Sequence, residues 1–475
     1  MITAHLHNAQ PTSAHYILRS FLMALACWCS ILACSGQVCA GGMFFSTAIC
    51  SDGQLVGWGG AHGNMITSAS TPTPLNPIFT FDGVIAVSSG IYHSVALRND
   101  GKVFTYGDNT YGQLGVGSSI SYSSNPLEVP GLSDVIAIEA GYYDVLVVLA
   151  DGSVRYWGQG AGGINFSPVV VTGLTDIVAV AAGSGAFMAL RADNTLWSWG
   201  IGWYGQLGQG DQITESQAPV QILTGISGIA AGGHQMMAVR TNGGLYLWGD
   251  NVWQDSGTGV PLDILWYPQE VLSVDDADPC GGVLCEVRAA GTTRLFHAAI
   301  VGAEGRVVYW GSSYDGILGQ RPVPLLRVDG SAVTGARALD GGHEHMLVEL
   351  VSGDILSFGR NGSGELGTGD VVTSWDRARQ VINLCPLLEV GMAEGSQIVR
   401  ATVHPNPCSD GITLEIPGEV ITSVEILNVL GQVSMSQRPG QGTVTLDTDR
   451  LRAGAYLLKG TTGRGATFVE RFMKE

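Results

Sequence analysis

Short apolar runs alternate with polar, glycine-rich text along most of the chain. Examples are HSVAL, from His93 to Leu97, and KVFTYG, from Lys102 to Gly107, with the polar text RNDG between them. Apolar or alternating runs of about four to eight residues, bounded by Gly, Asn and Asp, are typical of β-strands joined by tight turns. The pattern therefore predicts an all-β protein.

The strand pattern repeats, and each copy is marked by an aromatic residue followed by glycine. Successive aromatic residues are 42 to 62 positions apart, and periods of about 20–50 residues indicate solenoids or propellers. The chain contains seven copies of this step: Trp58-Gly59, Tyr106-Gly107, Trp157-Gly158, Trp199-Gly200, Trp248-Gly249, Trp310-Gly311 and Phe358-Gly359.

Two further columns of the repeat favour glycine. Tight hairpins need a positive φ, which glycine adopts freely and Asn tolerates best among the other residues. Five residues before each aromatic residue, the predicted turn positions are Gly53, Gly101, Gly152, Asn194, Gly243, Gly305 and Gly353. An earlier column predicts the corner between the first two strands and comprises Gly42, Gly90, Gly141, Gly183, Gly232, Gly291 and Gly342.

Each copy therefore predicts four strands: one before the corner, two in the hairpin and one after a polar loop. One such sheet cannot bury both faces alone, whereas sheets packed around an axis can, and closure of the ring protects their edges. The polar loop has nearly the same text, close to NxxGQLGxG, in Tyr106–Gly117, Trp199–Gly210 and Phe358–Gly369.

The combined pattern G…H-S-x-A-L…D-G-x-V…W-G…N-x-x-G-Q-L-G, clearest from Gly90 to Gly117, resembles the regulator of chromosome condensation repeat family. The resemblance covers roughly residues 37–385 and implies a seven-bladed β-propeller. The founding eukaryotic members are guanine nucleotide exchange factors on a nuclear GTPase. That activity is not expected here. The N-terminal signal peptide, the C-terminal sorting segment and the acidic composition, all described below, argue against a nuclear or cytosolic role.

After a predicted linker at 389–401, residues 402–475 have a different text. Alternating runs such as ITLEI and TVTLD predict a small β-sandwich. The segment resembles the type A sorting domain of the bacterial type IX secretion system, which implies export with that machinery as a partner. The matching residues are Pro405, Asn406 and Pro407, Leu430 with Gly431 and Gln432, Leu451 with Gly454 and Tyr456, and Phe472, Met473 and Lys474.

Residues 1–36 read as a secretory signal peptide. Arg19 precedes the apolar run Phe21–Cys34, which is too short for a comfortable transmembrane helix and is followed by small residues. Cleavage after Gly36 or Ala40 satisfies the small-residue rule. The segment QVCAGG, which matches the strand before each later repeat, favours cleavage after Gly36. It predicts a first strand that closes the ring beside the last repeat. The expected propeller then spans 37–388, with no transmembrane segment in the mature chain.

The composition narrows the class of ligand. The chain has a formal net charge of -18 and no basic run, so binding of nucleic acid by neutralising phosphates is not expected. Nine cysteines are present, and disulfides are expected after export because the compartment is oxidising. Cys280 and Cys285, which bracket CGGVLC, form the easiest local pair.

No residue pattern points to catalysis, and neither a cofactor nor a metal is predicted. Nucleophile-elbow, Walker, HExxH and dinucleotide motifs are absent from the sequence. His93, His297 and His345 share one repeat column, which favours a structural role over a metal cluster. Asp275, Asp276 and Asp278 lack the spacing of an EF-hand.

Aromatic residues in the loops after the aromatic-Gly step are the candidate binding residues. Equivalent loops of a propeller emerge on one face, where large aromatic side chains bind proteins or stack on sugars. The candidates are Tyr111, Trp203, Tyr204, Trp253 and Tyr314, together with Trp266 from the longest insertion.

The preferred hypothesis is a secreted or cell-surface recognition module that is not an enzyme and binds a protein through these loops. The first alternative is an extracellular protein that binds or degrades carbohydrate, which a pair of carboxylates in the central channel would support. The second alternative is a structural component of the cell surface.

Overall fold

The computed structural model describes residues 39–50, 53–60, 71–75, 83–210, 212–252, 256–261, 263–273, 280–313, 316–382, 402–404, 411–416, 419–427, 433–451, 454–464 and 467–474. The chain divides into two compact units, Met1–Cys385 and Pro386–Glu475. The described residues form strands and turns, so the all-β prediction is confirmed. None of them lies in a helix that is long and apolar enough to cross a membrane.

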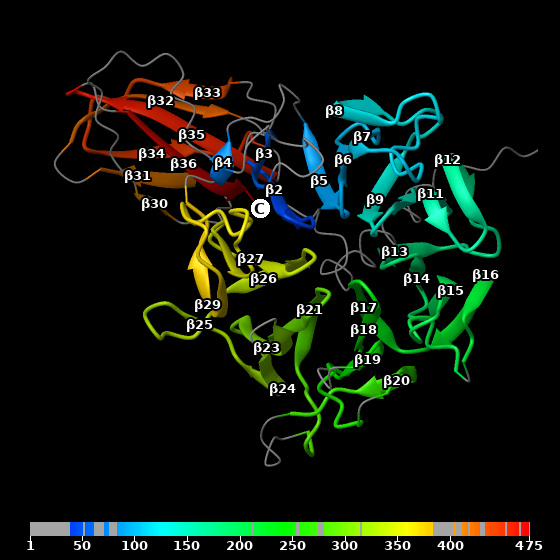
Figure 1. Cartoon of the computed structure of the whole chain (residues 1–475). Coiled ribbons are helices and arrows are strands. Elements are labelled where there is room, and N and C mark those ends of the chain that lie inside the picture. Colours follow the sequence, from blue (N-terminus) through cyan, green and yellow to red (C-terminus); the bar gives the residue numbers. More distant parts are fainter. Residues whose placement is uncertain are drawn as a thin grey trace, which may run out of the picture. The chain divides into compact units, whose positions relative to one another are not determined.

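The first unit consists of sheets arranged around a central axis (Figure 1). Its described part contains seven sheets, each built from strands that follow one another in the sequence. The first four sheets contain β1 (Cys39–Gly41), β2 (Phe45–Ile49), β3 (Leu55–Gly59) and β4 (Thr71–Leu75); β5 (Val84–Ser89), β6 (His93–Arg98), β7 (Val103–Asp108) and β8 (Tyr122–Glu128); β9 (Val135–Ala140), β10 (Asp144–Leu149), β11 (Val154–Gly160) and β12 (Gly163–Val170); and β13 (Ile177–Ala182), β14 (Ala186–Arg191), β15 (Leu196–Ile201) and β16 (Glu215–Leu223).

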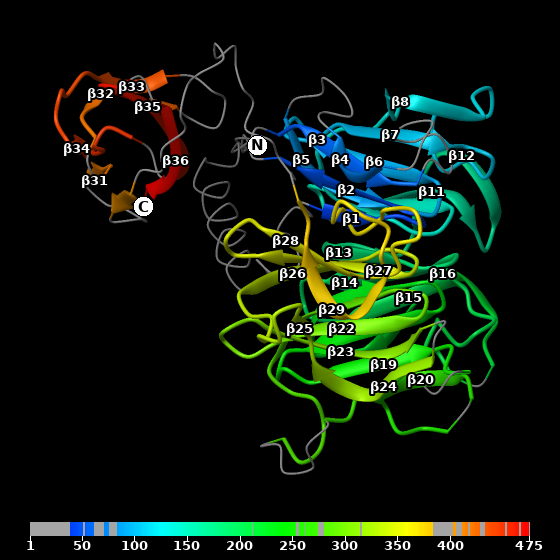
Figure 2. The same ribbon diagram turned by 60° about the vertical axis from the view of Figure 1, so that its left-hand side comes forward.

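The remaining sheets of this unit follow the same order. They contain β17 (Ile226–Ala231), β18 (Gln235–Arg240), β19 (Leu245–Gly249) and β20 (Leu265–Glu270); β21 (Val287–Thr292), β22 (Phe296–Val301), β23 (Arg306–Ser313) and β24 (Gly316–Pro324); and β26 (Ala336–Gly341), β27 (His345–Leu350), β28 (Ile355–Gly359) and β29 (Ser374–Gln380), with the short β25 (Leu326–Arg327) parallel to β29. The first strand of each sheet lies nearest the axis. β1 contacts β26 and β27 of the last sheet (Figure 2).

The hairpin turns have the backbone that the sequence predicts. All seven predicted turn positions have positive φ, from 65° at Gly305 to 86° at Gly353. Asn194 has a φ of 66°, so the one residue other than glycine in this column takes the left-handed conformation that Asn tolerates. This column of the repeat is therefore set by local backbone geometry.

The sixth sheet departs from the predicted columns. In the second sheet the corner amide of Gly90 donates to the carbonyl of His93. In the sixth sheet Thr293 takes this position and donates to Phe296, while Gly291 lies inside β21. The prediction that Gly291 forms the corner is wrong, because glycine at this corner is replaced by Thr293, whose hydroxyl also accepts from the amide of Phe296.

In the same sheet, His297 does not occupy the structural position that the repeat predicts for it. Phe296 pairs with Gly311, whereas His93 pairs with Gly107 and His345 with Gly359. The β22–β23 hairpin is one residue longer than its equivalents, so Phe296 takes the place of the column residue. A shift by one residue turns a side chain to the opposite face of a sheet. His297 therefore shares its sequence column with His93 and His345 but not its position in the fold.

The polar loop after the third strand joins its sheet to the next one at four junctions of the described ring. The indole Nε1 of Trp157 in the third sheet donates to the carbonyl of Gln113 in the loop of the second, at 2.9 Å. Gly115 follows in this loop, and a Cβ there would stand 2.8 Å from the same Nε1. The matching bonds are Trp248 to Gln206 at 2.9 Å, Trp310 to Ser256 at 3.2 Å and Trp58 to Glu365 at 2.8 Å.

The bond from Trp58 to Glu365 joins the first sheet to the last and so closes the ring. Further bonds cross the same junction, among them those from the Ser46 hydroxyl to the Glu365 carbonyl at 2.9 Å and from the His343 amide to the Gly42 carbonyl at 3.1 Å. The hydroxyl of Ser46 lies 2.7 Å from His345 Nε2, and the amide of Gly41 donates to Asp340 Oδ2 at 2.7 Å. No strand is exchanged between the first and last sheets in the described ranges, so side-chain packing and these bonds hold the junction.

The second unit contains two sheets that share one apolar core. The core joins Ile412 and Leu446 from one sheet with Val424 and Leu458 from the other. The sheets contain β30 (Thr402–His404), β31 (Gly411–Glu415) and β34 (Thr443–Asp447); and β33 (Val433–Gln437), β32 (Ile421–Leu427), β35 (Gly454–Thr462) and β36 (Thr467–Lys474).

The sorting-motif residues fall partly on these strands. Gly454 pairs with Lys474 between β35 and β36, and Tyr456 pairs with Phe472 in the same ladder. Met473 pairs with Ala455 in this ladder, and Leu451 is also described. The other named motif residues lie outside the described residues: Pro405, Asn406, Pro407, Leu430, Gly431 and Gln432.

A disulfide links Cys280 to Cys285, with a Cα–Cα distance of 6.2 Å. Cys50 is also disulfide-bonded, and Cys39 is a buried free thiol. The predicted signal peptide and linker lie outside the described residues.

Candidate functional site: the loop face and the axial cavity

In the described part of the first unit, two sets of loops emerge at the same end of the sheets. One set joins the first and second strands, and the other joins the third and fourth. In the second sheet they are hydrogen-bonded, because the amide of Asp108 donates to the carbonyl of Tyr92 at 2.9 Å. We call the surface formed by both sets the loop face.

The loop face carries an exposed tryptophan beside a rigid aromatic stack. Trp203 is 63% exposed, and the adjacent Tyr204 is 39% exposed. The ring of Tyr204 stacks on His234 from the next sheet, with centroids 4.1 Å apart and planes 13° from parallel. The Tyr204 amide donates to the side chain of Gln206 at 2.7 Å, and His234 Nδ1 lies 3.9 Å from Asp250. Backbone and side-chain contacts therefore fix the surface next to Trp203.

The other predicted aromatic residues occupy different environments. Tyr111 is half-buried, and its ring lies 4.7 Å from that of Tyr143 in the next sheet. Trp266 is half-buried on the outer strand β20 rather than in a loop, and its carbonyl accepts from Gly210. Trp253 and Tyr314 lie outside the described residues.

Tyr142 extends across the centre of the loop face. Its ring lies 5.7 Å from that of His343 in the last sheet. A Cβ at Gly233 in the fifth sheet would stand only 2.3 Å from the Tyr142 hydroxyl. The chain thus places one tyrosine over the mouth of the axis, between corners of two other sheets.

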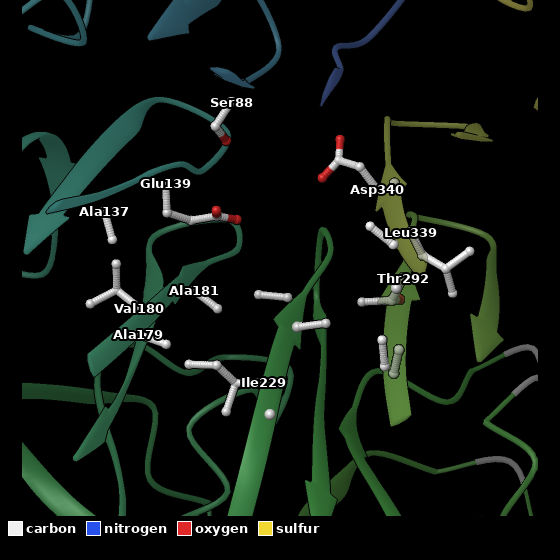
Figure 3. A pocket seen from close by; sticks show the side chains of 18 of the residues that line it. Ser88, Ala137, Glu139, Ala179, Val180, Ala181, Ile229, Thr292, Leu339 and Asp340 are labelled. Carbon is white, nitrogen blue, oxygen red and sulfur yellow. The ribbon is translucent and has the colours of Figure 1, made fainter. Parts of the chain in front are cut away.

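Behind this mouth lies an axial cavity of about 200 Å³, lined by the first strands of the sheets. Glu139 on β9 and Asp340 on β26 direct their carboxyl groups into it from different walls (Figure 3). Burial, followed by repulsion from Asp340 and Asp144, raises the pKa of Glu139 well above its usual range. Burial raises the pKa of Asp340 to about 7, against the opposing effect of the Gly41 amide.

We expect Glu139 and Asp340 to lower the free energy of unfolding as the pH rises from about 4 to about 8, so that a Glu139→Gln, Asp340→Asn double variant gains stability relative to the parent over this range. The buried His93 and His345, whose pKa values are lowered, act in the opposite direction but equally in both proteins. A raised pKa means that the native carboxyl keeps a proton that the unfolded chain releases. The stabilisation is therefore complete below the unfolded pKa and is lost as the pH rises through the folded pKa. For Asp340, the free energy of unfolding lost in this way is at most about 4 kcal/mol. The expected loss is smaller, because the carboxyl group of Asp340 faces the cavity.

Urea unfolding of parent and double variant at pH 5 and pH 8 measures this effect. Buried carboxyls that remain in the double variant, such as Asp144, contribute equally to both proteins. A difference in stability between the two proteins that is the same at both pH values would contradict the expectation.

The histidine column makes contacts between sheets. His93 Nε2 lies 3.3 Å from the carbonyl of Asp144, and His345 Nε2 contacts Ser46. Burial lowers the pKa of His93 to about 4 and that of His345 to about 3, so both rings are neutral near pH 7. Within the described ranges, no three His, Cys, Asp or Glu side chains lie in a group that could hold a metal ion.

The sequence interpretation missed the residues at the corners and on the axis. Tyr92, Tyr142, Tyr143 and His234 stand just after the corner glycines, in the texts GIYH, GYYD and GGHQ. Their position one or two residues after the glycine column was the available signal for a loop-face position. Glu139 has no such signal, because its neighbours across the axis are far away in the sequence.

Two sets of residues match families of known proteins. Residues 84–113 and 177–206, and residues 100–148 and 193–239, match regulator of chromosome condensation (RCC1) repeats. Residues 402–475 match the secretion system C-terminal sorting domain.

Curated relatives match over part of their length. Probable E3 ubiquitin-protein ligase HERC6 from Homo sapiens is 31% identical over 125 residues, which are 25% of this chain and 12% of that protein. Regulator of chromosome condensation from Xenopus laevis is 27% identical over 125 residues, which are 25% of this chain and 30% of that protein. The chain thus spans less than a third of the length of these relatives.

Solved structures share the fold. Human WBSCR16 has a TM-score of 0.54 at 22% identity, covering 65% of this chain and 85% of that chain. A chain in the crystal structure of Kap60 bound to yeast RCC1 (Prp20) has a TM-score of 0.56 at 17% identity, covering 80% and 91%. The chain therefore carries regulator of chromosome condensation repeats in an all-β propeller, followed by a secretion-system sorting domain that indicates export and a cell-surface or secreted location.

Proposed function

We propose that this protein is an exported recognition module that binds a protein partner through the loop face, with Trp203 at the centre of the contact. The exposure of Trp203 beside the fixed Tyr204–His234 stack is the observation that carries the proposal. Tryptophan and tyrosine are enriched among the residues that dominate binding energy. A surface that is already ordered loses little conformational entropy when a partner binds.

The fold supports the same class of function. Prp20p from Saccharomyces cerevisiae, whose crystal structure has a TM-score of 0.55 at 18% identity, is described by its binding properties to Gsp1p and histones. That statement concerns Prp20p, and it supports protein binding by a related scaffold rather than these partners. The sorting domain supports handling of this chain by the type IX secretion machinery and a partner outside the cell.

Affinity capture with the full mature protein tests the proposal. We expect Trp203→Ala to weaken binding of a captured envelope protein by at least about 30-fold, the effect of losing a contact of about 2 kcal/mol. Trp197→Ala is the matched control, because Trp197 lies on the same sheet near the hairpin end, with Arg191 4.6 Å above its ring. Equal binding by the two variants would contradict a contact centred on Trp203.

A polysaccharide panel in the same experiment separates the alternatives. Retention of glycans alone, sensitive to Trp203→Ala, would favour a carbohydrate-binding protein, and release of products would favour a hydrolase. Retention of neither proteins nor glycans would favour a structural component of the surface.

A further inference from the structure

The third sheet lacks the polar loop that the second and fourth sheets carry. Its strands β11 and β12 are joined by a tight hairpin instead, in which Gly160 pairs with Gly163. β12 and β16, the outer strands of the third and fourth sheets, follow one another around the ring (Figure 1). The junction between these two sheets is therefore built without the loop contacts that hold the junctions described above.

The indole of Trp199 has no acceptor at this junction. Trp199 belongs to the aromatic-Gly step of the fourth sheet and is only 3% exposed. Its counterparts Trp157 and Trp248 each donate to a carbonyl of the preceding loop at 2.9 Å. The ring of Trp199 contacts Phe187, with centroids 5.6 Å apart, but none of the residues that the structure describes accepts from its Nε1. A buried donor without an acceptor is unfavourable, so this N–H group favours an incoming acceptor.

The outer strand of the fourth sheet also lacks a loop contact. In the third sheet the carbonyl of Phe166 on β12 accepts from the amide of Gly117, at 2.8 Å. In the fifth sheet the carbonyl of Trp266 on β20 accepts from the amide of Gly210, at 3.0 Å. Gln217 has the equivalent position on β16, one residue after the partner of the step glycine. Gln217 is exposed, and within the described ranges no amide donates to its carbonyl.

The junction between the sixth and seventh sheets shows how the chain compensates where the same loop is missing. The third strand of the sixth sheet also turns directly into the fourth, with Ser313 paired to Gly316. The next aromatic residue is Phe358, which has no donor, and β25 runs parallel to the outer strand β29. In the described part of the fourth sheet neither compensation is present. Trp199 Nε1 and the Gln217 carbonyl are therefore open to another molecule.

The occupied junctions show which kind of segment supplies both bonds. In the loop of the second sheet, the Gln113 carbonyl accepts from the indole, and the amide of Gly117, four residues later, donates to the outer strand. Gly115 lies between them with a φ of 68°, and a Cβ there would stand 2.8 Å from the indole nitrogen. The loop of the fourth sheet repeats this spacing with Gln206, Gly208 and Gly210. The fitting segment is thus a short loop with glycine beside the indole.

Two residues near the junction limit the ligand further. Tyr156 stands in the column where Thr105 of the second sheet donates to the carbonyl of the loop residue Leu114. The ring of Tyr156 packs 5.8 Å from that of Phe187, so we expect a small residue in the ligand where the loop has Leu114. Pro219 on β16 has no amide hydrogen, so an added β-strand could not pair along the whole edge.

We propose that the junction between the third and fourth sheets binds a glycine-containing loop of a protein partner, whose carbonyl accepts from Trp199 Nε1 and whose amide donates to the Gln217 carbonyl. This inference rests on the proposed function, because the loop belongs to the protein that the module recognises. Trp203 lies near the start of the same edge, since the amide of Gly202 donates at 2.8 Å to the carbonyl of Thr214, next to β16. One partner can therefore contact both places.

A synthetic peptide with the sequence of residues 109–117 and the change Leu114→Ala tests the proposal on the full mature protein. Within this segment Asn109 Nδ2 donates to the Gly117 carbonyl at 3.0 Å, a bond that the isolated peptide can keep. NMR of isotope-labelled tryptophan indoles follows the titration, and Trp199→Phe assigns the Trp199 signal. We expect this signal to move with a dissociation constant of about 1 mM or lower. The same peptide with Gly115→Ala should bind at least about 10-fold more weakly.

Two variants locate the contact, with saturation-transfer NMR on the peptide as the measurement. Trp199→Phe should weaken binding at least about 5-fold, the effect of one lost hydrogen bond. This variant is expected to fold, because Phe358 fills the same column with no exposed surface, and its urea unfolding curve verifies this. Trp197→Phe is the matched control on the same strand, because Trp197 Nε1 already donates to Thr195 Oγ1 at 3.0 Å, and it should bind like the parent.

A Trp199 signal that stays in place at about 10 mM peptide, or unchanged binding in folded Trp199→Phe, would overturn the proposal. Movement of other indole signals alone would place the peptide elsewhere and would overturn it too. Partner capture that is lost in Trp203→Ala but unchanged in Trp199→Phe would contradict this site and leave the proposed function standing. Peptide binding at Trp199 without any capture sensitive to Trp203→Ala would support this site and contradict the contact centred on Trp203.

Discussion

Trp58→Ala is expected to lower the free energy of unfolding by about 3–5 kcal/mol, the range for removing a buried tryptophan from a core. Trp58 has no exposed surface and packs in a cluster with Cys50 of its own sheet and Leu347 of the last sheet. Its indole also donates to the carbonyl of Glu365. The substitution removes apolar contact and a hydrogen bond at the junction that closes the ring.

Two variants separate these contributions. Trp58→Phe keeps most of the ring but removes the donor, so a loss of about 0.5–1.5 kcal/mol is expected from this hydrogen bond. The Glu365 carbonyl is not left unpaired, because it still accepts from the hydroxyl of Ser46 at 2.9 Å. Trp203→Ala removes a tryptophan that is 63% exposed and should change stability by no more than about 0.5 kcal/mol. Denaturant unfolding measures all three. If Trp58→Ala behaved like Trp203→Ala, the junction would not depend on this packing.

Gly107→Ala is expected to destabilise the protein by about 3 kcal/mol or more. Gly107 has a φ of 110°, and a Cβ there would stand 2.3 Å from the carbonyl oxygen of Tyr92. Left-handed backbone costs a residue other than glycine about 1–2 kcal/mol, and relief of the overlap requires separation of strands β6 and β7 or movement of the corner. Every glycine of the aromatic-Gly step has a similarly close approach to the neighbouring corner or strand.

Gly117→Ala is the matched control in the same sheet. Gly117 has a φ of 91°, but nothing lies within 4 Å of a Cβ built there. This variant should therefore show the backbone cost alone, about 1–2 kcal/mol. Urea unfolding measures the free energy lost in each variant. Equal losses would mean that backbone conformation, rather than close packing, is the reason why glycine is needed after the aromatic residue.

The features that the sequence predicted well are those set by neighbours along the chain. The hairpin φ at Asn194 follows from the local need for a left-handed turn residue, and strands followed from apolar runs beside such turns. The repeated loop text was recognisable because the same contact, from the Trp157 indole to the Gln113 carbonyl, recurs at other junctions.

The features that could not be predicted depend on which residues meet across the ring. Glu139 and Asp340 are separated by most of the first unit in sequence, and neither belongs to a recognisable motif. Tyr142 contacts corners of two other sheets. His297 was assigned to the wrong structural position because counting back from Trp310 cannot detect one extra residue in the hairpin.

Each sheet of the first unit starts and ends within one consecutive stretch of chain. Duplication or deletion of one repeat in the gene would therefore add or remove a whole sheet without dividing any other sheet. The junction from Trp58 to Glu365 uses the same bond as the junction from Trp157 to Gln113, so a new neighbour with this loop would already match the old surface. A single duplication or deletion could therefore change the number of sheets in the ring, and related propellers are expected to differ in this number.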